Sequence, residues 1–154
     1  MSTLDKIILR LIKKNLSISI AESCTGGLIA SSITKINGAS KILSCGIVSY
    51  SNDTKVRYLS VSKKTLNKFG AVSSNVATEM IDGLYKKEKT KITISTTGIA
   101  GPNGGSRNKP VGLVYIGIRF KNKNYIYKNL FKGSRLEIQK KTTNFVFKKI
   151  EELI

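Results

Sequence analysis

The sequence contains no histidine and no tryptophan, and it has only two cysteines among its 154 residues. The absence of histidine excludes a Ser-His-Asp triad, a Cys-His pair and every zinc site that needs an imidazole ligand. The two cysteines, Cys24 and Cys45, are too few for a disulfide framework or for a metal site made of thiolates alone. A hydrolase of this composition must therefore use Lys, Tyr, Asp or Glu as its base, or a metal held by carboxylates.

Carboxylates are also scarce, with nine Asp and Glu against 27 Lys and Arg and a formal net charge of +18. Three of the nine, Asp5, Glu151 and Glu152, lie near the ends of the sequence, so we expect no metal site and no other cofactor. The positive charge favours anionic partners. The alternative is compositional drift, because 22 of the 27 basic residues are scattered lysines, as an AT-biased genome would encode.

Long apolar runs are missing as well. No segment approaches the roughly 20 apolar residues needed to span a bilayer, and residues 1–14 interleave charges with Leu and Ile, unlike a signal peptide. We therefore expect a cytoplasmic protein without a membrane partner. A length of 154 residues with 40% hydrophobic content predicts one domain, over residues 1–154, that buries its own core.

Hydrophobic periodicity predicts alternating helices and strands followed by a late strand pair. In the first part we expect a helix over residues 4–12, a strand over 17–22, a helix over 24–36, a strand over 43–50, and helices over 62–69 and 73–87. In the second part we expect a strand over 91–97, a glycine-rich loop over 98–110, a hairpin of 111–120 with 124–131, and a closing helix over 134–154. This order predicts an α/β layered domain with a mixed β-sheet.

The segment Ala-Glu-Ser-Cys-Thr-Gly-Gly (residues 21–27) stands at a predicted strand-to-helix junction. Ser23 would lie where the strand ends and the free amides of the next helix begin, and such amides stabilise an oxyanion or hold a phosphate. The alternative is purely structural: Ser23 or Thr25 caps the helix, and Gly26 and Gly27 ease a tight turn.

A second segment, Tyr50 to Lys55, lies at the end of the strand predicted over residues 43–50. In a chain without histidine, a lysine of lowered pKa is the natural base for a serine nucleophile, and a nearby tyrosine can relay or orient the proton. Serine followed three residues later by lysine also occurs at Ser32, Ser60 and Ser106, as chance would produce, and we assign no role to those three.

The third segment is the run Thr-Gly-Ile-Ala-Gly-Pro-Asn-Gly-Gly (residues 97–105), which continues to Lys-Pro-Val-Gly (109–112). A glycine-rich loop after a strand is typical of a phosphate or nucleotide cradle, because bare backbone amides can approach an anion. It lacks the order of a Walker A or GxGxxG motif, and a structural loop is an equally good interpretation on local grounds.

Taken together, these segments resemble the CinA C-terminal family in order and spacing. The resemblance is carried by residues 21–27, 46–52 (Gly-Ile-Val-Ser-Tyr-Ser-Asn), 70–73 (Gly-Ala-Val-Ser), 97–102 and 109–112, and it covers nearly the whole sequence. It implies a single three-layer α/β/α domain. It also implies hydrolysis of the carboxamide of nicotinamide mononucleotide, an anionic small molecule, to nicotinic acid mononucleotide and ammonia.

The resemblance assigns roles residue by residue. Ser23 matches the nucleophile, Lys55 its general base and Tyr50 the third catalytic member. The substrate-binding positions that it implies are Thr25, Gly26, Gly27, Thr97, Gly98, Gly101 and Arg135. We also expect a homo-oligomer, a dimer.

The sequence departs from the family pattern in two places, because the family usually has Asp where Ser134 stands and a second Arg where Gln139 stands. Longer family members carry an N-terminal domain similar to molybdopterin-binding proteins, which has no counterpart here, so we expect no pyrophosphatase activity. Two alternatives to an amidohydrolase stay open. One is a catalytically silent CinA-like binding protein. The other, less favoured, is a basic nucleic-acid-binding module, because the sequence has no Arg-rich patch and no aromatic stacking motif.

Overall fold

The computed structural model describes residues 1–154 and contains a five-stranded sheet in the order β2-β1-β3-β4-β5. The strands are β1 (Ile18–Glu22), β2 (Leu43–Val48), β3 (Ile92–Gly98), β4 (Leu113–Phe120) and β5 (Lys123–Leu130). The helices are α1 (Thr3–Lys13), α2 (Leu28–Thr34), the 3-10 turn η1 (Ala39–Lys41), α3 (Asn52–Leu59), α4 (Lys63–Phe69), α5 (Ser74–Glu88) and α6 (Arg135–Leu153).

The sheet is mixed, as the sequence predicts. Strands β2, β1 and β3 run parallel, while β4 is antiparallel to β3 and β5 is antiparallel to β4. The β4–β5 hairpin turns at Lys121 and Asn122, which have positive φ values of 49° and 62°. Because parallel strands end at the same edge of a sheet, the residues that follow β1, β2 and β3 are brought together there.

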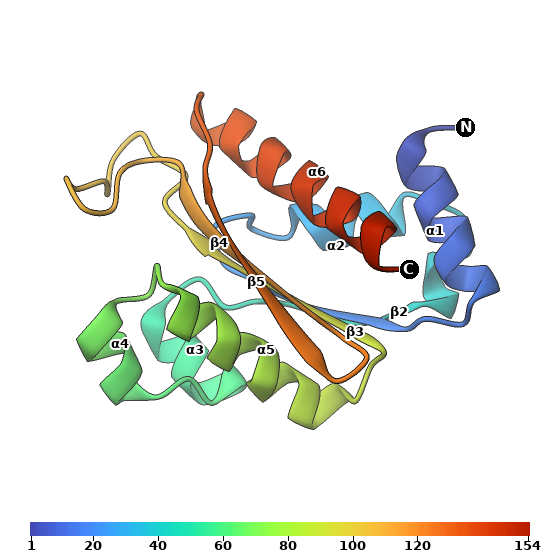
Figure 1. Ribbon diagram of the computed structural model, residues 1–154, viewed down its shortest axis with the longest axis horizontal. Helices are drawn as coiled ribbons and strands as arrows, with labels where there is room; N and C mark the ends of the chain where they lie inside the picture. The colour runs from blue at the N-terminus through green and yellow to red at the C-terminus, as the bar shows by residue number, and fades with distance from the viewer.

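Helices cover both faces of the sheet, which confirms the three-layer α/β/α architecture. Helices α1, α2 and α6 lie on one face, and α3, α4 and α5 lie on the other (Figure 1). All five residues of β1 are buried, as expected of a strand with helices on both sides. The segment that follows β1, which contains Ser23, therefore starts from a fully buried strand.

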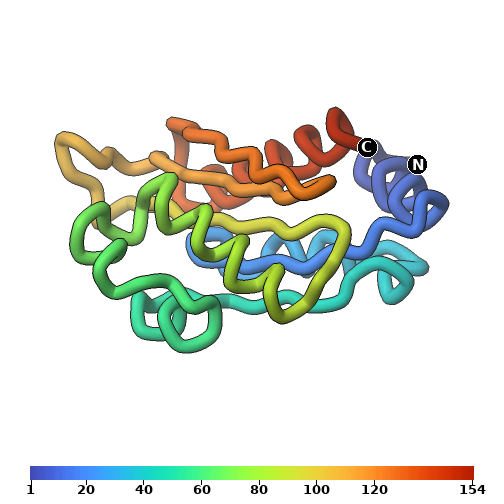
Figure 2. The backbone as a smooth tube through the Cα atoms, turned by 60° about the horizontal axis from the view of Figure 1, so that its bottom comes forward, coloured from blue at the N-terminus to red at the C-terminus, as the bar shows by residue number.

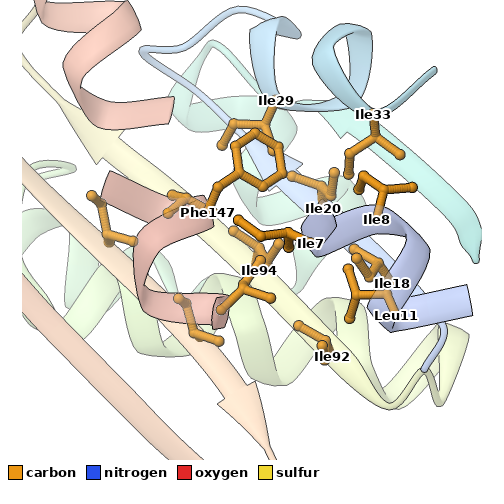
Figure 3. Packing of buried hydrophobic residues seen from close by; sticks show 14 of the residues in the cluster. Ile7, Ile8, Leu11, Ile18, Ile20, Ile29, Ile33, Ile92, Ile94 and Phe147 are labelled. Atoms are coloured by element: carbon orange, nitrogen blue, oxygen red, sulfur yellow. The ribbon is translucent and has the colours of Figure 1, made fainter. Parts of the chain in front are cut away.

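The larger hydrophobic cluster lies between the sheet and helices α1, α2 and α6. Figure 3 shows α1, β1, α2, β3 and α6 meeting there through the side chains of Ile7, Ile8, Leu11, Ile18, Ile20, Ile29, Ile33, Ile92, Ile94 and Phe147. A smaller cluster on the other face joins Ala21 of β1 to residues of α3 and α5, among them Leu59 and Met80. Alternate β1 side chains thus enter opposite cores.

Most helices begin close to the predicted residues, and serine side chains cap them. Ser2 and Ser134 each form a capping box, with Asp5 in α1 and Glu137 in α6, in which the side chains and amides of both residues pair reciprocally. Helices α4 and α5 are likewise capped by serine side chains. In α6, the serine that replaces the usual Asp of the family therefore still caps the helix.

Two predictions about elements were wrong. The helix predicted over residues 24–36 is limited to α2, its N-cap is Gly27 with φ 97°, and no side chain caps it, so neither Ser23 nor Thr25 has that role. The sequence analysis also missed α3, which begins after the Ser51 cap. Only Lys55 and Leu59 are buried in α3, so the segment lacks the repeated apolar positions by which a helix is recognised.

The glycine-rich loop between β3 and β4 extends from one end of the molecule, near α4, whereas both termini lie at the other end (Figures 1 and 2). The loop therefore starts at the same sheet edge as the segments after β1 and β2. None of the helices has the length and apolar content needed to cross a membrane.

Candidate active site

The side chains of Ser23 and Lys55 meet at the carboxyl ends of β1 and β2. Ser23 directly follows β1, and Lys55 projects from the first half of α3. The ammonium nitrogen Nζ of Lys55 lies 2.9 Å from Ser23 Oγ and also donates to the carbonyl oxygens of Ser49 at 2.7 Å and Tyr50 at 3.3 Å. The structure thus brings together the two residues that the sequence analysis paired as nucleophile and base.

The Lys55 side chain is almost completely buried, with 1% of its surface exposed. Burial disfavours the charged amine and lowers the pKa of Lys55 from 10.5 to about 8. No carboxylate forms an ion pair with Lys55, since the salt bridges of the structure are Arg57–Asp53 and Lys149–Glu152. A sizeable fraction of neutral amine near neutral pH makes Lys55 chemically suited to accept a proton from Ser23.

Cys24, the neighbouring candidate nucleophile, lies in a different environment. Its side chain belongs to the larger hydrophobic cluster and is 5% exposed. Burial raises the pKa of the Cys24 thiol to about 12, so the thiolate is strongly disfavoured. Of these two neighbouring side chains, that of Ser23 is the one that forms a hydrogen bond with Lys55.

The carboxylate of Glu22 organises the turn that carries Ser23. Glu22 is 1% exposed, and it accepts hydrogen bonds from the amides of Gly27 (3.1 Å), Ile29 (3.2 Å) and Ala30 (2.9 Å). The expectation that the first amides of the helix are free for a ligand is therefore wrong. They are occupied by a carboxylate, which also complements the positive end of the helix dipole.

The other turn residues predicted to bind substrate, Thr25, Gly26 and Gly27, help to fix the conformation of the same turn. The hydroxyl of Thr25 donates to Glu22 Oε2 at 2.5 Å and lies 2.9 Å from the hydroxyl of Thr96. Gly26 and Gly27 adopt left-handed conformations with φ of 58° and 97°, which side-chain-bearing residues rarely adopt. These contacts give the turn a fixed shape around Ser23.

On the opposite side of the site, Arg135 links the glycine-rich loop to Tyr50. Its guanidinium donates to the carbonyl oxygen of Gly101 at 2.7 Å and to the hydroxyl of Tyr50 at 2.5 Å. The Tyr50 side chain is 58% exposed. Tyr50 therefore contacts Lys55 through its carbonyl oxygen and Arg135 through its hydroxyl.

The remaining predicted positions, Thr97 and Gly98, close β3. The hydroxyl of Thr97 donates to the carbonyl oxygen of Ala71 at 2.7 Å, which joins β3 to the segment before α5. A Cβ atom at Gly98 would lie 2.7 Å from the carbonyl oxygen of Leu113, so only glycine fits there without a shift. Both residues fix the start of the glycine-rich loop.

Sequence reasoning missed the turn-forming roles of Glu22, Thr96 and Gln139. The side-chain amide of Gln139 in α6 donates to the carbonyl oxygen of Cys24 at 2.9 Å. The available signal for Glu22 was an acidic residue at the end of a strand expected to be buried. Thr96 and Gln139 are distant in sequence and had no local signal. No three Cys, Asp or Glu side chains are grouped so that they could hold a metal ion.

A model of the CinA C-terminal domain family matches residues 2–154. The chain belongs to the CinA C-terminal domain family. Among curated relatives, a CinA-like protein of Fusobacterium nucleatum is 53% identical over 133 residues, which cover 86% of this chain and 32% of that protein. A CinA-like protein of Kosmotoga olearia is 48% identical over 144 residues, covering 93% of this chain and 35% of that protein. The CinA-family chain thus spans about a third of the length of the curated relatives it matches.

Solved structures of the family agree with the fold. A competence-damaged protein (CinA) superfamily protein from Escherichia coli superimposes with a TM-score of 0.92 and 31% identity, covering 99% of this chain and 91% of the other. A competence/damage inducible protein from Agrobacterium tumefaciens gives a TM-score of 0.91 and 36% identity, covering 99% and 96%. These names state a family and not a reaction.

Proposed function

We propose that the protein hydrolyses the carboxamide of nicotinamide mononucleotide, forming nicotinic acid mononucleotide and ammonia, with Ser23 as nucleophile and Lys55 as general base. The observation that carries the proposal is the 2.9 Å contact between a buried lysine of lowered pKa and a serine at a strand-to-turn junction. Activation of a serine by a neutral lysine is a known solution where histidine is absent.

In the proposed reaction, neutral Lys55 takes the hydroxyl proton of Ser23 as Oγ attacks the carboxamide carbon. The tetrahedral intermediate collapses when the Lys55 ammonium returns the proton to the leaving nitrogen, which departs as ammonia. Water then attacks the acyl-Ser23 ester with Lys55 again as base. The Lys55 ammonium returns the proton of the water to Ser23 Oγ as the ester bond breaks, and the carboxylic acid formed gives up its own proton, which converts the released ammonia to ammonium. Protons and bonds therefore balance over the cycle.

The substrate assignment is supported by the resemblance to the family and by the cationic group across the site. Arg135 presents a guanidinium whose present partners, a carbonyl oxygen and a phenol, are neutral. A substrate phosphate is a stronger acceptor for this group than either of them. We therefore assign phosphate binding to Arg135.

The two departures from the family pattern do not favour a silent binding protein. Ser134 caps α6 and accepts from the amide of Glu137 at 3.3 Å, so the helix that carries Arg135 still begins at the expected residue. Gln139 still donates a hydrogen bond to the turn of the nucleophile. Both replacements keep the site assembled.

The direct test is ammonia release from nicotinamide mononucleotide by the purified protein, with the product identified by mass spectrometry. Ser23→Ala should abolish release, whereas Ser31→Ala, which changes an exposed serine of α2, should not. Absence of ammonia from the unsubstituted protein would contradict the substrate assignment. Loss of release in Cys24→Ala together with full release in Ser23→Ala would assign the nucleophile to the thiol.

A further inference from the structure

The turn after β1 (residues 23–27) uses three of its five backbone N–H groups within the protein. The amide of Ser23 donates to the carbonyl oxygen of Thr96 at 3.1 Å, and the amide of Gly26 donates to that of Ser23 at 3.0 Å. The amide of Gly27 is held by Glu22. The amides of Cys24 and Thr25 donate to no backbone carbonyl oxygen of another residue. These two N–H groups, next to the proposed nucleophile in the chain, are the donors of the turn that a bound group can use.

The peptide groups that carry these two amides are both anchored by their carbonyl oxygens. The Ser23–Cys24 peptide is held by the Gly26 amide, and the Cys24–Thr25 peptide is held by Gln139, whose Nε2 lies 2.9 Å from the Cys24 oxygen. Neither peptide is cis. In a planar trans peptide the C=O and N–H bonds point in opposite directions. The bond from Gln139 therefore sets the direction of the Thr25 N–H.

We propose that Gln139 is a positioning residue, which orients the Cys24–Thr25 peptide so that the Thr25 amide joins the Cys24 amide in binding the oxyanion of the tetrahedral intermediate. The inference rests on the proposed function. When Ser23 Oγ attacks, the carbonyl oxygen of the substrate gains the negative charge, and two fixed N–H donors stabilise it without reorganising during the reaction. Gln139 itself touches neither substrate nor reacting atoms.

The position of Gln139 suits this role. The residue is half-buried on α6. A Cβ atom built on Gly26 would lie 3.8 Å from its Nε2, so the side-chain amide of Gln139 is in van der Waals contact with the turn. One turn of α6 further along, the hydroxyl of Thr143 donates to the carbonyl oxygen of Gln139 at 2.9 Å. The side chain therefore reaches the turn from a helix that packs against the sheet, and it joins α6 to a segment distant in sequence.

The test compares three substitutions at Gln139. Gln139→Met keeps the length of the side chain but removes the donor, and Gln139→Glu replaces the donor with an acceptor that repels the Cys24 carbonyl. Gln139→Arg keeps an N–H donor. Removal of one oxyanion donor costs about 100- to 1000-fold in kcat, so loss of the residue that aims a donor should cost about 10- to 100-fold.

We expect Gln139→Met and Gln139→Glu to lower kcat by that factor with little change in KM or in the apparent pKa of the rate. Gln139→Arg should restore most of kcat. Lys140→Met, an exposed neighbour on α6, is the matched control. Unchanged kcat in Gln139→Met, or an equal loss in Gln139→Arg, would overturn the proposal, as would a loss confined to KM.

A second readout separates this inference from the choice of substrate. A small fluorophosphonate should label Ser23, because its phosphoryl oxygen gains charge in the same place, and labelling is followed by mass spectrometry of the intact protein. Slower labelling in Gln139→Met than in Lys140→Met supports the role of Gln139 even if nicotinamide mononucleotide is not hydrolysed. Equal labelling rates, or no labelling of the unsubstituted protein, would contradict it.

Discussion

Lys55 Nζ lies 2.9 Å from Ser23 Oγ, although 32 residues separate the two in the chain. The contact is possible because β1 and β2 are parallel neighbours, so both end at the same edge of the sheet, and α3 begins at Asn52, soon after β2 ends at Val48. The chemistry of this contact depends on whether the Lys55 amine carries its proton. A charged Lys55 only donates to the serine, whereas a neutral Lys55 can accept the serine proton, so the site should respond to pH through this residue.

The first prediction concerns the pH dependence of the rate. Because neutral Lys55 is the active form and its pKa is lowered to about 8, kcat/KM should rise with pH through an apparent pKa of about 8. Initial rates of ammonia release between pH 6 and pH 10 measure this, with stability in each buffer checked separately. A rate that falls across this range would exclude Lys55 as the base.

The second prediction distinguishes a base from a mere positive charge. Lys55→Arg should lose nearly as much activity as Lys55→Ala, because a guanidinium does not release its proton at these pH values. Tyr50→Phe should be milder, since it removes a hydroxyl that contacts Arg135 and leaves the backbone carbonyl that holds Lys55. A Lys55→Arg protein with close to full rate would move the role of base to another residue.

The third prediction links Lys55 to stability. Its pKa is lower in the folded protein than in the unfolded chain, so between about pH 8 and pH 10.5 the unfolded chain binds more protons and stability rises with pH. Relative to Lys55→Met, the unfolding free energy of the unsubstituted protein should increase over this window by up to about 3 kcal/mol. Urea unfolding of both proteins at pH 7 and pH 10 measures the difference. A constant difference would mean that the folded-state pKa of Lys55 is not lowered.

The fourth prediction concerns Glu22. In Glu22→Gln, an N–H₂ group faces the donors that now share a buried carboxylate, so the unfolding free energy should fall by about 2–4 kcal/mol. The rate per folded molecule should also fall, because the turn that presents Ser23 loses its anchor. Glu151→Gln, an exposed carboxylate, is the control for urea unfolding. Equal stabilities of the two variants would show that Glu22 does not hold the turn.

The fifth prediction tests phosphate binding by Arg135. A charge-assisted hydrogen bond contributes about 1.5–3 kcal/mol, so Arg135→Ala should raise KM for nicotinamide mononucleotide by about 10- to 100-fold. For nicotinamide riboside, which lacks the phosphate, the same substitution should change KM little. Arg10→Ala, on the exposed side of α1, controls for loss of positive charge. Equal effects on both substrates would place the phosphate elsewhere.

Much of the fold follows from local sequence features. Hydrophobic periodicity predicted the strands β1 and β3 and the helices α1, α4 and α5 close to their observed bounds. The helix α3 was not predictable in this way, because its one fully buried polar residue, Lys55, occupies the position where an apolar residue would have revealed the pattern. The buried Lys55 is therefore the reason why the apolar pattern of α3 is not recognisable in the sequence.

The sequence by itself determined the alternation of helices and strands and the absence of imidazole chemistry, because these depend on residue types and short-range spacing. The pairing of Ser23 with Lys55 came from the resemblance to the CinA C-terminal family. Only the tertiary structure decided which groups are free and which are occupied. Glu22 accepts from the amides of Gly27, Ile29 and Ala30 at the start of α2. The Cys24 carbonyl accepts from Gln139, and the Tyr50 hydroxyl accepts from Arg135. The physical reason is that hydrogen-bond partners and burial depend on which strands and helices lie side by side, and residues such as Cys24 and Gln139, 115 positions apart, meet only when the chain is folded.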